Sequence, residues 1–145
     1  MMLCPLRLQP LLQALLQQQQ TSGAPISLAL TDSHGELLHF TRMAGASLHS
    51  GELARNKAYT AARDRQSTRD LGAWSRNSGR TLPYWSDARF TGFAGGVPLW
   101  HEGAVVAAVG ISGLSEEEDH RLATELTHAL GQHLISNGDL NRGIS

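Results

Sequence analysis

The chain has 145 residues and a formal net charge of −1. This length is close to the usual size of one domain, so we predict a single domain over residues 1–145, and the near-zero charge argues against binding to nucleic acid or to a membrane surface. One cysteine, Cys4, excludes an intrachain disulfide, and the absence of a long apolar run argues against a signal peptide or membrane span, so we expect a cytoplasmic protein.

The N-terminal part predicts a helix followed by a β-hairpin. Leucines recur at helical spacing between Leu8 and Gln20, and Gly23 and Pro25 end the helix. Several of these leucines are expected to be exposed, which would suit a contact between subunits. Residues 26–31 and 36–42 favour strands, and the segment 32–35 between them has the composition of a tight turn.

The middle of the chain predicts two more helices. Ser47 can cap a helix that runs to about Arg65, and small side chains at steps of three and four residues would let this helix lie close to a sheet. A short helix is expected over residues 67–74. The segment 76–93 is irregular and rich in aromatic residues, and so long a connection is usually functional or packed by its own aromatic side chains.

The C-terminal third predicts a second hairpin and a last helix. Strands are expected over residues 97–100 and 104–111, and Ser115 followed by three glutamates begins a helix that continues to about Leu134. A polar tail starts at about residue 137. This order of elements predicts an α+β fold in which helices cover an antiparallel sheet.

Two glycine-rich segments flank the second hairpin and can leave backbone N–H groups without strand partners. Gly95-Gly96 precedes the first of its strands, and Ser112-Gly113 follows the second. Bare N–H groups of this kind can hold a carboxylate or a phosphate without a charged side chain. The alternative is that the glycines only permit tight turns and close contact between a helix and the sheet.

Two cationic side chains are candidates for an anion site. Lys57 lies on the small-residue face of its helix, where a lysine is either paired with a buried carboxylate or turned toward a ligand. Arg42 ends a strand just before a glycine-containing loop, and its planar guanidinium suits a carboxylate, although a structural salt bridge would explain it equally well.

No catalytic signature is visible. The seven histidines lack the spacing of a metal site, and Ser112 lacks the full Gly-x-Ser-x-Gly pattern of a hydrolase. We therefore assign no catalytic residue, and the pattern favours a binding protein over an enzyme.

Short motifs spread from about Pro25 to Leu126 are specific when taken together. They comprise Ala29–Asp32 with Gly35, Arg42–Met43, Gly45–Ala46, Lys57–Ala61, Gly95–Pro98, Gly103, Val109–Gly113 and Asp119. On these motifs the chain resembles the GlcG/HbpS-like family of haem-binding or haem-degrading domains. The C-terminal domain of PduO-type corrinoid adenosyltransferases belongs to the same group.

The resemblance implies a profilin-like fold, in which an antiparallel sheet of about five strands lies between helices, and a homo-oligomer. It implies haem, a related tetrapyrrole or corrinoid, or a small anionic metabolite as the ligand. A haem iron takes a His, Met, Cys or Tyr ligand, and the first predicted helix has no histidine, so His39, His49 and Met43 are the candidates. The expected ligand-binding residues are Arg42, Met43, Lys57, Gly95, Gly96, Ser112 and Gly113.

Two other functions remain open at this point. One is an oligomeric accessory or assembly protein of a diol, glycerol or glycolate utilisation pathway, without a ligand of its own. The other is an enzyme that degrades haem.

Overall fold

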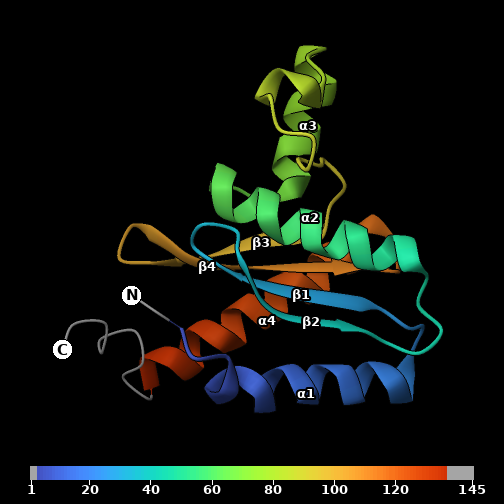
Figure 1. Cartoon of the computed structure of the whole chain (residues 1–145), viewed down its shortest axis with the longest axis vertical. Helices are drawn as coiled ribbons and strands as arrows, with labels where there is room; N and C mark the ends of the chain where they lie inside the picture. Colours follow the sequence, from blue (N-terminus) through green and yellow to red (C-terminus); the bar gives the residue numbers. More distant parts are fainter. Residues whose placement is uncertain (1–2, 137–145) are drawn as a thin grey trace.

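The computed structural model describes residues 3–136 and has an α+β architecture. Its four strands form one antiparallel sheet in the order β2-β1-β4-β3. In Figure 1, α2 lies on one face of this sheet, and α1 and α4 lie on the other. No helix within residues 3–136 is both long and apolar enough to cross a membrane. The elements are α1 (Pro5–Ser22), β1 (Ser27–Asp32), β2 (Leu37–Arg42), α2 (Leu48–Asp64), α3 (Thr68–Ser78), the 3-10 helix η1 (Leu82–Trp85), β3 (Gly96–His101), β4 (Ala104–Ser112) and α4 (Glu116–Ser136).

The expected count of about five strands is wrong for residues 3–136, where the sheet has four. The two predicted hairpins supply all four of them, and the segment between the hairpins contains α2, α3, η1 and loops but no strand. The predicted element boundaries differ from the observed ones by a few residues. The polar tail expected from about residue 137 lies outside the described residues.

The turn between β1 and β2 forms as its composition predicts. The Asp32 carboxylate accepts hydrogen bonds from the backbone N–H groups of His34 (2.8 Å) and Glu36 (3.0 Å). Gly35 has a φ of 87°, in the left-handed region that favours glycine. The turn therefore sets the register in which Ser27 of β1 lies opposite Arg42 of β2.

The two central strands present large residues on one face and small residues on the other. Leu28 of β1 and Ile111 of β4 belong to the main core, which they share with leucines of α1 and α4. Ala29 of β1 and Ala108 of β4, on the opposite face, pack instead against alanines of α2. The sheet is therefore covered by a leucine-rich layer on one side and by a closely packed alanine layer on the other.

The expectation that the leucines of the first helix are exposed is wrong for Leu8 and Leu12, which are fully buried in the main core. The physical reason is that α1 helps to cover the leucine-rich face of the sheet, so its apolar stripe is used within the chain. Leu6, in the first turn of α1, is 81% exposed. Three further leucines are partly buried against the core: Leu11, Leu15 and Leu16.

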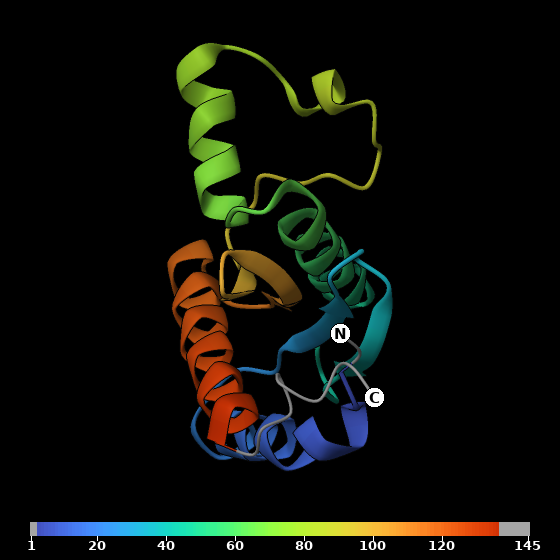
Figure 2. The same cartoon turned by 90° about the vertical axis from the view of Figure 1, so that its left-hand side faces the viewer.

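Residues 67–93, which we call the arm, extend away from the layered body of the molecule (Figures 1 and 2). Within the arm, the rings of Trp74 and Trp85 meet edge to face with their centroids 4.6 Å apart. The indole N–H of Trp85 donates to the Asp64 carboxylate of α2 (3.0 Å). Trp85 of the long connection is thus held against Trp74 of α3 and Asp64 of α2.

We predict that Gly110→Ala destabilises the fold by about 3 kcal/mol, because the added methyl group would overlap the Ala54 carbonyl oxygen of α2 and lie 2.7 Å from the Ala58 nitrogen. Gly103→Ala is the matched control: Gly103 has a φ of 80° and open space around it, so only backbone strain of about 1 kcal/mol is expected. Equilibrium unfolding in urea, followed by circular dichroism, gives the free energy of unfolding of both variants. Equal losses would contradict the close contact between α2 and β4.

Candidate ligand site

The residues predicted to bind a ligand fall in two separate places. Lys57, Gly95, Gly96, Ser112 and Gly113 surround a buried cluster between α2, β4 and the start of α4. Arg42 and Met43 lie instead at the end of β2, in a groove beside α1. Lys57 does not line this groove, so the two predicted cations belong to different surroundings.

Lys57 is tied to the interior of the protein. Its side chain is 2% exposed, and its ammonium group donates to the Ile111 carbonyl oxygen (2.9 Å) and to the Asp119 carboxylate (3.2 Å). Burial lowers the pKa of Lys57, while the carboxylates of Asp119 and Glu116 act in the opposite direction. In this arrangement Lys57 is paired with a buried carboxylate, which is the first of the two interpretations that the sequence allowed.

Asp119 occupies backbone N–H groups at the end of the second glycine-rich segment, those of Gly113 and Leu114. Its carboxylate accepts from the Leu114 N–H (3.1 Å), and the Gly113 N–H also favours the charged form. Burial raises the pKa of Asp119, and Lys57 opposes that rise. The anion held at these amides is therefore a side chain of the chain itself.

The remaining glycine and serine candidates take part in close packing at the same place. The Gly96 N–H donates to the Thr68 hydroxyl (2.9 Å), and a Cβ on Gly95, whose φ is 128°, would come within 2.9 Å of the Lys57 ammonium nitrogen. Ser112 is buried and lies opposite Ser27 in the sheet. A ligand-binding role for Lys57, Gly95, Gly96, Ser112 and Gly113 stays a prediction.

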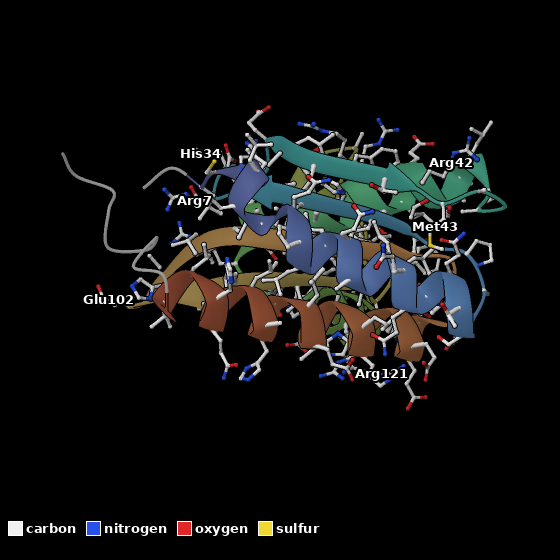
Figure 3. The ribbon with its side chains drawn as sticks, turned by 90° about the horizontal axis from the view of Figure 1, so that it is seen from below. Arg7, His34, Arg42, Met43, Glu102 and Arg121 are labelled. Carbon is white, nitrogen blue, oxygen red and sulfur yellow. The ribbon has the colours of Figure 1, made fainter. Side chains whose placement is uncertain are left out.

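The groove between α1 and β2 brings together three of the predicted residues: His39, Arg42 and Met43. They line a cavity of about 370 Å³, and Figure 3 shows Arg42 and Met43 at the end of β2 that passes over α1. The Arg42 guanidinium donates to the Ala46 carbonyl oxygen (2.7 Å), which fixes the loop after β2. The Met43 sulfur accepts the Ile26 N–H at 3.5 Å.

His39 in this groove is partly buried, and burial lowers the pKa of its imidazole, which favours the neutral form. Its Nε2 atom lies 2.9 Å from the Thr41 hydroxyl oxygen. A neutral imidazole with one nitrogen engaged can present the other as a metal ligand. His49, the other histidine candidate, is exposed in the first turn of α2 and does not line the groove.

The opposite wall of the groove consists of glutamines that the sequence analysis did not single out. Gln9, Gln13, Gln17 and Gln20 of α1 all line the cavity. Their spacing of four, four and three residues places them along one helical face, next to the buried leucine stripe. The sequence alone therefore shows that the four glutamines share one helical face. That this face lines a groove follows only from the position of α1 beside the edge strand β2.

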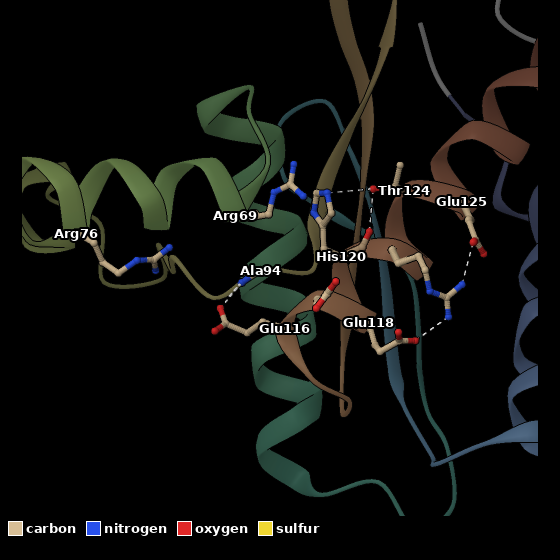
Figure 4. A pocket seen from close by; sticks show the side chains of 10 residues that line it. Arg69, Arg76, Ala94, Glu116, Glu118, His120, Thr124 and Glu125 are labelled. Carbon is tan, nitrogen blue, oxygen red and sulfur yellow. Dashed lines mark hydrogen bonds and ion pairs between the residues drawn. The ribbon is translucent and has the colours of Figure 1, made fainter.

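A larger cavity, of about 690 Å³, lies between α3 of the arm and the start of α4 (Figure 4). Its α4 wall is acidic: Glu116 accepts the Ala94 N–H (2.9 Å), and Glu118 pairs with Arg121 (2.7 Å). The Nδ1 atom of His120 is buried here without a hydrogen-bond partner, and burial and the nearby Arg69 lower the pKa of this histidine. The lining holds four glutamates and three arginines, Arg69, Arg76 and Arg121, so its opposite charges nearly balance.

Within residues 3–136 no three histidine, cysteine, aspartate or glutamate side chains are grouped closely enough to hold a metal ion.

Comparisons with known proteins agree on one family. A family model described as "Haem degrading protein HbpS-like" matches residues 7–127. The corrinoid adenosyltransferase PduO of Salmonella typhimurium is 33% identical over 120 residues, which cover 80% of this chain but only 35% of PduO. Protein GlcG of Escherichia coli is 31% identical over 96 residues, 66% of this chain and 70% of GlcG. A crystal structure of a PduOC–haem complex has a TM-score of 0.78 and 30% identity, and covers 89% of this chain and 95% of that one.

We predict that Lys57→Met lowers the free energy of unfolding by about 3–5 kcal/mol, because it leaves the buried Asp119 carboxylate without its partner. The double variant Lys57→Met/Asp119→Asn should recover part of this loss, since it removes both charges. Urea unfolding at neutral pH gives the free energy of unfolding of the wild type, the single variant and the double variant. A loss below about 1 kcal/mol for Lys57→Met would show that the lysine is not a structural partner.

Proposed function

The chain belongs to the HbpS-like family, and from this membership we propose that it binds haem in the groove between α1 and β2. The observation that carries the proposal is the presence in one cavity of a histidine, a methionine and an arginine: His39, Met43 and Arg42. These supply the types of group that an iron porphyrin with carboxylate side chains requires. The haem complex of PduOC, which has the same fold, supports this choice of ligand.

His39 is the residue we propose as the iron ligand. Its Nε2 atom can donate to Thr41, 2.9 Å away, which leaves the Nδ1 lone pair for the metal. A second hydrogen bond of this kind commonly fixes the tautomer and orientation of a ligating histidine. Because burial lowers the pKa of His39, the ring is in the neutral form that ligation needs.

Arg42 and the glutamines are suited to the carboxylates of the ligand. Arg42 is exposed, and its bond to Ala46 uses only one of its five N–H donors. Among the described residues that line the groove, it is the one permanently charged side chain, so the groove attracts an anion. The carboxamides of the α1 glutamines add neutral donors along the other wall, and Met43 and Leu16 add apolar surface.

Haem supplies an iron centre that can take up ligands and change its oxidation state. Of the residues that line the groove, His39 alone can exchange a proton near neutral pH. The groove therefore has the composition of a binding site, and its one titratable group is committed to the metal. For this reason we propose haem binding and assign no catalytic residue.

We expect added hemin to bind with one-to-one stoichiometry and to give a shifted Soret band in an absorption titration. His39→Ala should weaken binding by more than about tenfold, because it removes the proposed iron ligand. His49→Ala is the matched control and should leave the titration unchanged, since that histidine is exposed and outside the groove. No spectral shift with folded wild-type protein, or equal effects of the two variants, would contradict the proposal.

We also predict how haem binding depends on pH. Burial lowers the pKa of His39 below its ordinary value of 6.5, so the ring is mostly neutral when the pH has fallen to that value. Affinity should therefore hold down to about pH 6.5 and be lost only at lower pH, when His39 becomes protonated. Hemin titrations of the wild type and of His39→Ala over this range test the prediction. A wild-type affinity that declines already above pH 6.5, or the same profile in the variant, would argue against His39.

A further inference from the structure

Two adjacent cavities beside the arm share the same pair of charged residues. The cavity of about 690 Å³ between α3 and α4 and a recess of about 260 Å³ within the arm are both lined by Arg76 of α3 and Glu116 of α4. Figure 4 shows these two side chains on either side of the larger cavity. A single ligand held by Arg76 and Glu116 can therefore extend from one cavity into the other.

Some of the charges in the larger cavity neutralise one another, and the others are left for a ligand. Arg121 is paired with two glutamates of its own helix (2.7 and 2.9 Å). Among residues 3–136, by contrast, the side chains of Arg76 and Glu117 make no hydrogen bond or salt bridge. Glu116 accepts the Ala94 N–H through one carboxylate oxygen (2.9 Å), which leaves its other oxygen available. One guanidinium and several carboxylate oxygens together complement a molecule that carries both a carboxylate and an ammonium group.

His120 adds an unsatisfied polar atom to the wall of the same cavity. Its Nδ1 atom is buried and has no hydrogen-bond partner among residues 3–136. A buried nitrogen without a partner costs free energy, and in a neutral imidazole it can accept a hydrogen bond. A local shift of the surrounding side chains would let an ammonium group in the cavity satisfy it.

The recess within the arm provides an apolar surface of limited size. Leu82, Phe90 and Phe93 line it, and Phe93 is 56% exposed. Gly72 and Gly92 bring α3 and the returning loop together backbone to backbone, because a Cβ on Gly72 would overlap the Gly92 carbonyl oxygen. The space of about 260 Å³ has room for one aromatic or branched apolar side chain, and the two rings in its wall suit such a group.

We propose that these two cavities together bind a free amino acid with an apolar side chain. Arg76 would hold its carboxylate, Glu116 and Glu117 its ammonium group, and the recess its side chain. A zwitterion suits a lining in which three arginines nearly balance four glutamates, whereas an ion of one sign would leave part of that lining unpaired. Among the described residues, none lines both this site and the groove between α1 and β2, so the inference stands independently of the proposed function.

Titration of the full chain with L-phenylalanine at neutral pH, followed by calorimetry and by saturation-transfer NMR, tests the proposal. We expect one-to-one binding with a Kd below about 1 mM. Three analogues should bind at least about tenfold more weakly, because each leaves part of the site without its partner. Glycine lacks the side chain, 3-phenylpropionate lacks the ammonium group, and phenethylamine lacks the carboxylate. An analogue that binds as tightly as L-phenylalanine would overturn the proposal.

Two arginine variants test where the amino acid binds. Arg76→Gln removes the charge proposed to hold the carboxylate and should weaken L-phenylalanine binding by at least about tenfold. Arg80→Gln is the matched control and should leave the affinity unchanged, since Arg80 is exposed on the same arm but lines neither cavity. Circular dichroism verifies that both variants are folded.

No binding of L-phenylalanine to the folded wild type in either measurement, or equal effects of the two arginine variants, would also overturn the proposal. Hemin titrations of Arg76→Gln should match those of the wild type, because Arg76 lies outside the groove between α1 and β2. A failure of this site is therefore distinguishable from a failure of the proposed haem site.

Discussion

The salt bridge between Lys57 and Asp119 ties α2, β4 and α4 together in the interior of the molecule and so positions one wall of the larger cavity. It joins the middle of α2 to the first turn of α4, and through Ile111 it reaches the central strand β4. Two opposite charges in the interior are stable only when further hydrogen bonds satisfy them, and here a carbonyl group and two N–H groups do so. The position of α4, and with it the acidic wall beside the arm, depends on this pair.

The unequal faces of the sheet explain where a ligand can bind. On the α2 face, alanines and Gly110 bring the helix so close to the strands that no space remains. On the other face, leucines of α1 and α4 fill the centre. Among the described residues, open volume lies away from these two packed centres, at the glutamine side of α1, between α3 and α4, and within the arm.

Much of the fold could be predicted from local patterns in the sequence. The residues themselves indicated two hairpins and therefore four strands, and the fifth strand came from the family resemblance alone. Contacts between distant residues could not be foreseen: Lys57 was recognised as unusual, but its partner Asp119 lies 62 positions away and is brought close only by the packing of α4. Likewise His39 and Met43 were candidates, but the glutamine wall that completes their groove depends on the position of α1 beside β2.

The edge position of β2 affects how a large flat molecule could enter the groove between α1 and β2. β2 is paired on one side only, to β1, whereas β1 and β4 have partners on both sides. Displacing an outer strand breaks one ladder of hydrogen bonds, so its local opening requires far less free energy than opening the middle of the sheet. The side chains proposed to hold the porphyrin thus lie at one of the two edge strands of the sheet, where widening of the groove would leave the native packing at the centre of the domain intact.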